Sequence, residues 1–246
     1  MASQNTHHVD PDSEAGDPTT NADRTAGDQQ PKVTQIILVR HGKTSTTGSI
    51  LPGRTPGLYL SEEGIAQAES VAAGLKAELL NSDAKETPEI HLFASPLERT
   101  QQTAEPISQA LNLPIQTLDD ILEADFGEWT GQELAELRKL PEWKQVQESP
   151  STFRFPGGES FLEMQTRVVS GLERVKDAHP GAVLICVSHA DVIKCAMAHF
   201  LGMGLDDFQR LFISPCSRSE IAFTENGHMV MTMNSLSGNT KREDNG

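Results

Sequence analysis

The clearest hydrophobic pattern in the chain is a pair of unbroken apolar runs, each of which leads into a histidine. Residues 36–39 read IILV and continue directly into Arg40 and His41, and residues 182–187 read AVLICV and reach His189 after one serine. Runs of this kind are typical of strands buried on both faces of a sheet. Because open α/β sheets bind ligands beyond the carboxyl ends of their strands, both histidines are predicted to lie at a ligand-binding edge.

The remaining patterns alternate between strands and helices. This alternation indicates an α/β fold, a three-layer sandwich whose mostly parallel central sheet carries helices on both faces. The pattern predicts, in chain order, a helix capped by Ser61, a strand at 90–94, a helix opened by Ser95-Pro96, helical segments at 130–147 and 159–178, a helix after His189, and a hairpin of 221–223 with 229–233 around 225–227.

The sequence makes a specific prediction for each of the first two helices. Apolar spacing places Ile65, Ala68, Leu75 and Leu79 on one face of the first helix, which should pack on the sheet. Proline lacks the backbone N–H that a helix interior needs, so Pro106 should bend or end the second helix.

Composition separates one folded domain from two tails. Residues 1–31 are polar and nearly free of large aliphatic side chains, and residues 236–246 are similar, so both are expected to be disordered or flexible. Residues 32–235 are expected to form a single domain.

Charge and hydropathy narrow the classes of partner. A net charge of -15 repels nucleic acids and anionic membrane surfaces. There is neither a secretion leader nor a run of about 18 apolar residues, so a soluble cytoplasmic protein is expected.

Neither the cysteines nor the histidines show a metal-ligand spacing. Cys186 lies in a predicted strand, Cys195 lies on the following helix, and no Cys-x-x-Cys motif is present. Free thiols in such positions usually act as small apolar residues. The adjacent His7 and His8 stand in the polar tail, where solvation is the simpler interpretation. No metal and no cofactor are therefore expected.

Polar residues that could take part in catalysis follow the predicted strands, in segments 40–47, 95–104, 122–131 and 188–191. An imidazole can act as a nucleophile, and a guanidinium next to it can hold an anion in bidentate fashion. Phosphoryl transfer requires such a nucleophile, cations around the phosphoryl oxygens and a proton donor for the leaving oxygen. These segments together offer all three.

The same segments resemble the motifs of the histidine phosphatase superfamily, also called phosphoglycerate mutase-like. The matching stretches are LVRHGKT at 38–44, SPLERTQQTA at 95–104, LEADFGEWTG at 122–131 and SH at 188–189. They occur in the family's order and span nearly all of 33–235. The stretch FPGGES at 155–160 resembles the phosphatase branch of that superfamily.

The resemblance implies a role for each matched residue. His41 becomes phosphorylated during turnover, Arg40, Arg99 and His189 surround the phosphoryl group, and Glu123 donates the proton. The two arginines should also lower the pKa of His41, which must be unprotonated to attack. Other carboxylates lie near Glu123 in the sequence, at Asp125 and Glu128, and the motif register favours Glu123 over both.

Three positions depart from the family's usual residues. Lys43 stands where Glu is common, Thr47 where Asn is common, and Pro56 where Asp is frequent. We expect these changes to lie at the pocket mouth and to alter substrate choice while leaving the phosphoryl site intact. Arg54, in the same loop, is a candidate for binding a second anionic group of the substrate.

The sequence therefore predicts a metal-independent phosphatase that hydrolyses a small phosphomonoester through a covalent phosphohistidine. The alternative enzyme is a cofactor-dependent phosphoglycerate mutase, which resembles longer proteins with more basic residues between the acid and the second histidine. A non-catalytic phosphate-binding module is the alternative of another class, and it would be expected to lack His41, Glu123 or His189. The partner is a small phosphorylated metabolite; its identity and the oligomeric state are left open.

Overall fold

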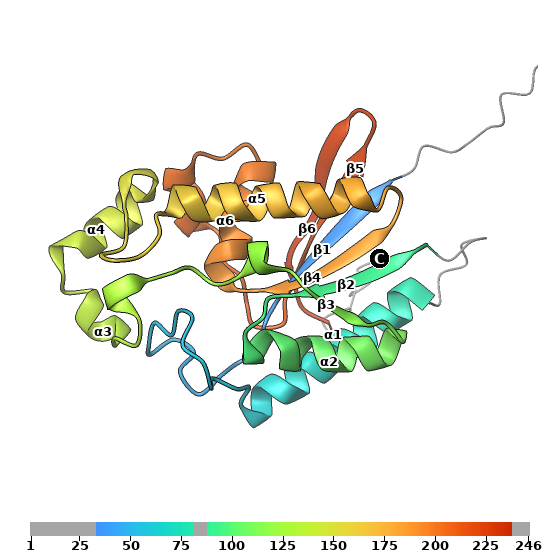
Figure 1. The fold of residues 1–246 in the computed structure, drawn as a ribbon, viewed down its shortest axis with the longest axis horizontal. Helices are drawn as coiled ribbons and strands as arrows, with labels where there is room; N and C mark the ends of the chain where they lie inside the picture. The colour runs from blue at the N-terminus through green and yellow to red at the C-terminus, as the bar shows by residue number, and fades with distance from the viewer. Residues whose placement is uncertain (1–32, 81–87, 238–246) are drawn as a thin grey trace, which may run out of the picture. The chain divides into compact units, whose positions relative to one another are not determined.

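The computed structural model describes residues 33–80 and 88–237, which form one six-stranded sheet with helices on both faces (Figure 1). The strand order is β3-β2-β4-β1-β5-β6. Strands β1 to β4 pair in parallel, and the last two strands pair antiparallel. The strands are β1 (Thr34–Arg40), β2 (Ile90–Ala94), β3 (Ile115–Thr117), β4 (Val183–Ser188), β5 (Arg218–Thr224) and β6 (Gly227–Ser235).

The α-helices are α1 (Glu62–Leu80), α2 (Glu98–Leu111), α3 (Leu134–Leu137), α4 (Pro141–Glu148), α5 (Phe161–Ala178) and α6 (Ala190–Phe200). The start of α5 has a capping box, in which the Ser160 side chain accepts a hydrogen bond from the Glu163 N–H while the Glu163 carboxylate accepts one from the Ser160 N–H. None of the helices in the described residues is long and apolar enough to cross a membrane.

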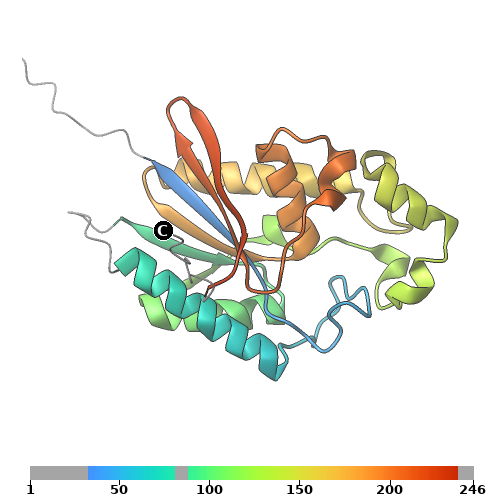
Figure 2. The ribbon, with the colours of Figure 1, turned by 180° about the vertical axis from the view of Figure 1, so that it is seen from behind.

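Residues of β1 alternate between the two layers of the core. Ile36 and Leu38 pack with the apolar faces of α5 and α6. Their neighbours Ile37 and Val39 point to the opposite face, where they pack with α1 and α2. Figures 1 and 2 show these helix pairs on opposite sides of the sheet. Burial on both faces explains why residues 36–39 of this strand are all aliphatic. Helices on both faces of the sheet confirm the predicted sandwich.

The sheet register brings the two predicted histidines together. Strands β1 and β4 are parallel neighbours, with Arg40 paired to Ser188, so the next residue of each chain segment leaves the same edge of the sheet. The backbone N–H of His41 donates to the Ser188 carbonyl over 2.9 Å. His189 follows directly as the N-cap of α6.

Gly42 is required by a close approach of two backbones at this edge. A Cβ atom at residue 42 would lie 2.5 Å from the carbonyl oxygen of Gly64, in the first turn of α1. The Gly42 N–H also donates to Thr103 Oγ1 over 3.0 Å. The absence of a side chain therefore lets the segment after His41 pack directly on α1.

The structure departs from the sequence predictions at four places. Pro106 was expected to bend or end helix α2, and the helix does not end there but continues to Leu111, because Ile107 and Leu111 are buried in the core and this packing outweighs the lost hydrogen bond. Ile65 is exposed, and the buried face of α1 consists of Ala68, Val71, Ala72, Leu75 and Leu79.

The expected helix at 130–147 is instead two short helices, α3 and α4, with Pro141 starting the second at a position where proline is favoured. The sequence pattern does not predict the short edge strand β3, which has only three residues. Apart from Leu236 and Ser237, the expected tails at 1–31 and 236–246 lie outside the described residues, so their boundaries stay predictions.

Candidate active site

His41 leaves the end of β1 with one ring nitrogen already engaged. Its Nδ1 lies 2.7 Å from the carbonyl oxygen of Gly42. A carbonyl oxygen can only accept, so Nδ1 carries the proton and Nε2 keeps its lone pair. Burial, followed by the charges of Arg99 and Arg40, lowers the pKa of His41 to about 3. The imidazole is therefore neutral near pH 7, and its Nε2 is available as a nucleophile.

His189 lies beside it, with 5.3 Å between the two ring centroids. The ring is fully buried, and its Nε2 is 2.8 Å from the hydroxyl of Ser95, which follows β2. Burial and the neighbouring Arg99 hold the pKa of His189 well below its usual range. Its Nδ1 has no hydrogen-bond partner among the described residues and lies 3.6 Å from Glu123 Oε2. This nitrogen is directed into the site.

Two arginines contribute N–H groups that lack partners. The fully buried Arg99 donates from Nη2 to the Gly53 carbonyl over 2.9 Å, whereas its Nε and Nη1 have no partner in the described chain. Arg40 donates from Nη1 to the Ile213 carbonyl over 2.6 Å, and its Nε is likewise without one. Burial lowers the pKa of both guanidinium groups, while the nearby Glu123 opposes that shift. Buried donors without acceptors are costly, so this cluster is arranged for a bound anion.

Glu123 supplies a carboxyl group with an unusual proton affinity. It is 7% exposed, and its Oε1 accepts from the Ala124 N–H over 3.0 Å. Its Oε2 lies 3.8 Å from Arg99 Nη2. Burial raises the pKa of Glu123 from 4.5 to about 7, against the opposing charge of Arg99. A carboxyl group with this pKa can deliver a proton near neutral pH and take one back.

The loop that carries Glu123 is held in place from behind. Arg54 donates from Nε to the Glu123 carbonyl over 2.8 Å and from Nη2 to Glu159 Oε1 over 3.2 Å. Arg167 donates to the same Glu159 oxygen over 2.7 Å and to the carbonyl of Leu122 over 2.8 Å. Glu159 Oε1 also accepts from the Asp125 N–H over 3.0 Å. This network fixes the backbone on both sides of the acid.

The catalytic edge opens into a pocket of about 360 Å³. A charged pair lies in its wall, where Lys194 Nζ is 3.1 Å from Asp191 Oδ1. The lining otherwise combines the site residues Arg40, His41 and Glu123 with hydroxyl groups of Thr44, Thr46 and Thr47 and with the apolar side chains of Ile50, Leu51, Pro52, Phe126, Leu134, Phe212 and Ile213.

Five of the six predicted site residues, namely Arg40, His41, Arg99, Glu123 and His189, therefore come together at one edge of the sheet. The sixth, Arg54, directs its guanidinium to the acid loop and does not line the pocket. Its role in substrate binding stays a prediction, and its contacts fit a positioning role better.

Segments 95–104 and 188–191 include Ser95 and Asp191, but the sequence did not single out either residue, and Lys194 lies beyond these segments. Ser95 follows β2 directly, and the other two lie on α6 just after β4, so the rule that located the histidines could have found them. Of the three positions that depart from the family's usual residues, Thr47 lines the pocket. The other two do not line it, contrary to expectation: Lys43 pairs with Glu63 at the surface, and Pro56 is exposed.

Comparisons with known proteins identify the family of the chain. The model of the family described as "Histidine phosphatase superfamily (branch 1)" matches residues 36–236. Phosphoserine phosphatase 1 of Hydrogenobacter thermophilus is 32% identical over 205 residues, which cover 81% of this chain and 92% of the relative. The probable phosphoglycerate mutase GpmB of Yersinia pestis is 29% identical over 193 residues, covering 78% of this chain and 86% of the relative.

Solved structures show the same fold. YhfR of Bacillus stearothermophilus superposes with a TM-score of 0.72 at 24% identity, covering 83% of this chain and 98% of that one. Phosphoserine phosphatase of Entamoeba histolytica, solved in complex with 3-phosphoglyceric acid, gives a TM-score of 0.71 at 24% identity and covers 82% and 98% of the two chains.

The family match extends over most of the chain, and it includes both strands that end in histidine. Phosphatase names occur among the relatives and structural neighbours, so hydrolysis of a small phosphomonoester is better supported than the mutase alternative. The chain therefore belongs to the histidine phosphatase superfamily, branch 1, which confirms the predicted phosphatase.

Proposed function

We propose that this phosphatase transfers the phosphoryl group of a small metabolite to Nε2 of His41 and then to water. Arg40, Arg99 and His189 hold the phosphoryl oxygens, and Glu123 supplies and recovers the proton. One observation carries this assignment. Four buried nitrogens that have no hydrogen-bond partner among the described residues belong to the three side chains next to His41, whose own ring proton is held on Nδ1.

The four nitrogens are Nε of Arg40, Nε and Nη1 of Arg99, and Nδ1 of His189. The arginine atoms are all donors, and Nδ1 of His189 becomes one when Ser95 donates to Nε2 of the same ring. Leaving such groups unsatisfied inside a protein costs about 1 to 3 kcal/mol each. A dianionic phosphoryl group satisfies them, because each of its oxygens accepts charge-assisted hydrogen bonds.

The first chemical step forms the covalent intermediate. The Nε2 lone pair of His41 attacks phosphorus while the ester P–O bond breaks, and the leaving alkoxide takes the proton of Glu123. In the second step water attacks phosphorus and gives its proton to the Glu123 carboxylate. The P–N bond breaks, inorganic phosphate leaves, and both side chains return to their starting states. The arginines balance the charge on the phosphoryl oxygens throughout.

The pocket supports a substrate with a short body. A volume of about 360 Å³ is near the lower end of the range for small-molecule sites. Lys194 and Asp191 present opposite charges in its wall, which suits a substrate bearing both a carboxylate and an ammonium group. O-phosphoserine is therefore the first substrate to test, and the name of the H. thermophilus relative points in the same direction.

The experiment is a phosphate-release assay with O-phosphoserine, 3-phosphoglycerate, a sugar phosphate and p-nitrophenyl phosphate. We expect phosphate release from at least one alkyl phosphate. Conversion of 3-phosphoglycerate into its isomer without phosphate release would favour the mutase alternative. Absence of turnover with all four, despite tight binding of inorganic phosphate, would favour a non-catalytic binding module.

We also propose that the enzyme works in the cytoplasm. Its three cysteines, Cys186, Cys195 and Cys216, are all free and buried, as is usual in a reducing compartment. Burial raises the pKa of each thiol, so none of them is activated as a nucleophile.

A further inference from the structure

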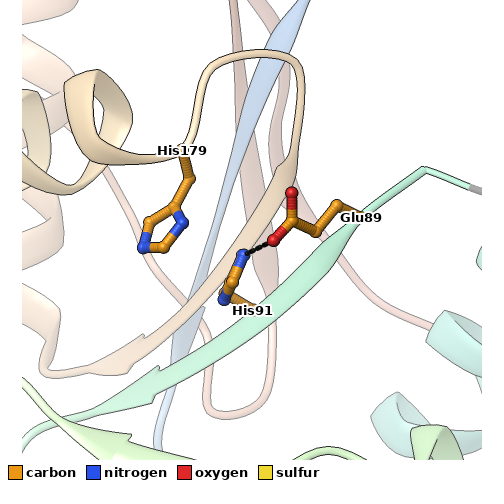
Figure 3. A group of neighbouring side chains, drawn as sticks. All are labelled: Glu89, His91 and His179. Carbon is orange, nitrogen blue, oxygen red and sulfur yellow. Dashed lines mark hydrogen bonds and ion pairs between the residues drawn. The ribbon is translucent and has the colours of Figure 1, made fainter.

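We propose that Glu89, His91 and His179 form a zinc site at the amino ends of β2 and β4, the end of the sheet opposite the active site. One ligand atom from each residue lies within 4.8 Å of the other two. Figure 3 shows the two imidazole rings and the carboxylate directed toward one another, from the start of β2 and from the turn between α5 and β4. The expectation that the chain has no metal site rested on spacing in the sequence, which cannot show this meeting.

The three side chains are held by well-anchored backbone. His91 pairs with Leu184 near the amino ends of β2 and β4, and the Glu89 carbonyl accepts from the Val183 N–H over 2.8 Å. His179 ends α5 in a turn, in which its carbonyl accepts from the Ala182 N–H over 3.2 Å. Little backbone freedom would be lost when a metal binds, which favours affinity.

The distances are compatible with tetrahedral coordination after a small movement of side chains. His91 Nε2 is 2.8 Å from Glu89 Oε1, and a ligand nitrogen of His179 lies within 4.8 Å of a ligand atom of each of the other two residues. Zinc ligands at about 2.0 to 2.1 Å lie roughly 3.4 Å from one another. Glu89 is exposed, so its carboxylate can move away from His91 to reach that separation.

The donor set selects the class of metal. Two imidazoles and one carboxylate suit Zn²⁺ and similar transition metals, whereas Mg²⁺ and Ca²⁺ prefer oxygen ligands alone. The cluster lies at the surface, because its carboxylate is exposed and both histidines are partly exposed. Water can therefore take the fourth position on the metal.

Gln116 on β3 provides a partner for the outer nitrogen of His91. His91 Nε2 donates to Glu89 Oε1, and its Nδ1 lies 3.5 Å from the Gln116 amide nitrogen. Zinc binding at Nε2 requires the ring proton to move to Nδ1. Rotation of the Gln116 amide by half a turn would then present its oxygen as the acceptor, as is usual behind metal-bound histidines.

This site would act on stability and leave catalysis alone. His91 precedes Ser95 by four residues of an extended strand, which is about 13 Å along β2. A metal that joins the end of α5 to β2 binds only the folded chain, so it should raise the melting temperature.

The test is a Zn²⁺ titration of the full-length protein, followed by calorimetry and by thermal melting. We expect one site per chain that raises the melting temperature, and at least tenfold weaker binding in His91→Gln, His179→Gln and Glu89→Gln. Glu89→Gln changes an exposed residue, so its loss of affinity would not reflect misfolding. Co²⁺ in place of zinc should give the visible absorption of a tetrahedral nitrogen and oxygen site in the wild type only.

Two controls locate the metal. His199→Gln removes an exposed histidine of α6 outside the cluster and should leave binding unchanged. Replacing both His7 and His8 by Ala should also leave it unchanged. If the zinc-induced rise in melting temperature survives in His91→Gln and His179→Gln, or disappears in the His7/His8 variant, the proposal is overturned. The Glu89→Gln, His91→Gln and His179→Gln variants should turn over p-nitrophenyl phosphate within about twofold of the wild-type rate. This result separates the zinc test from the test of the phosphatase mechanism.

Discussion

Replacing Glu123 by Gln isolates the proposed proton donor, because the amide keeps the size and most hydrogen bonding of the side chain and removes its acidic proton. Burial raises the pKa of this carboxyl from 4.5 to about 7. A rise of that size corresponds to about 3 kcal/mol against the ionised form. The carboxyl should therefore be about nine-tenths protonated at pH 6 and about one-tenth protonated at pH 8.

The sign of the pH dependence follows from the protonation state that each residue needs. The acid must be protonated in the free enzyme, so kcat/KM for an alkyl phosphate should fall about tenfold from pH 6 to pH 8. The pKa of His41, at about 3, leaves the nucleophile neutral over this whole range. Second ionisation of the substrate, near pH 6, affects wild type and variant alike, so the roughly tenfold fall is measured as the change in the ratio of the kcat/KM of the wild type to that of the Glu123→Gln variant.

The Glu123→Gln enzyme should lose the alkaline decline together with most of its rate on alkyl esters, by about 10²- to 10⁴-fold. An aryl phosphate such as p-nitrophenyl phosphate has a stable leaving group and should be affected far less. Single-turnover formation of the phosphoenzyme with both esters gives the comparison. Asp125→Asn is the matched control, because Asp125 is a neighbouring carboxylate that does not line the pocket.

Equal losses with the two esters would refute the assignment, as would an alkaline decline that persists in Glu123→Gln. Glu123 would then have a structural or electrostatic role. Asp125 and Glu128 would become the candidates for the acid.

Three further predictions concern charge, packing and metal. Arg99→Lys keeps the charge but loses the fixed pair of donors, so kcat/KM measured with p-nitrophenyl phosphate should fall about 10²- to 10³-fold, and a loss below fivefold would contradict the role of this guanidinium. Gly42→Ala would force a Cβ to within 2.5 Å of the Gly64 oxygen, so chemical denaturation should show about 1 to 3 kcal/mol less stability; an unchanged midpoint would refute the packing argument. Excess chelator should leave kcat unchanged because the arginines stabilise the charge, and a loss restored by Mg²⁺ or Zn²⁺ would overturn metal independence.

The sequence was most informative where a buried strand leads directly into polar residues of the site. The runs before His41 and His189 are aliphatic because both faces of β1 and β4 are covered, and this burial fixes where each strand ends. Parallel pairing of those strands then places the two histidines together. The polar residues of the site could thus be predicted from strand ends and motif order.

Long-range packing lay beyond these local patterns. The continuation of α2 past Pro106 depends on the core that Ile107 and Leu111 enter, whereas proline by itself predicts a bend or an end of the helix. The role of Arg54 depends on Glu159, which follows it by more than 100 residues and approaches it only in the fold. The same holds for His91 and His179, whose meeting depends on the pairing of β2 with β4.

The central claim is that one histidine carries the phosphoryl group. The most direct measurement is to quench a turnover reaction rapidly under alkaline conditions and map the phosphorylated residue by mass spectrometry. The account predicts an acid-labile adduct on Nε2 of His41, and no adduct in His41→Ala. Label on a serine, on an aspartate or on His189, or an adduct that persists in His41→Ala, would contradict it.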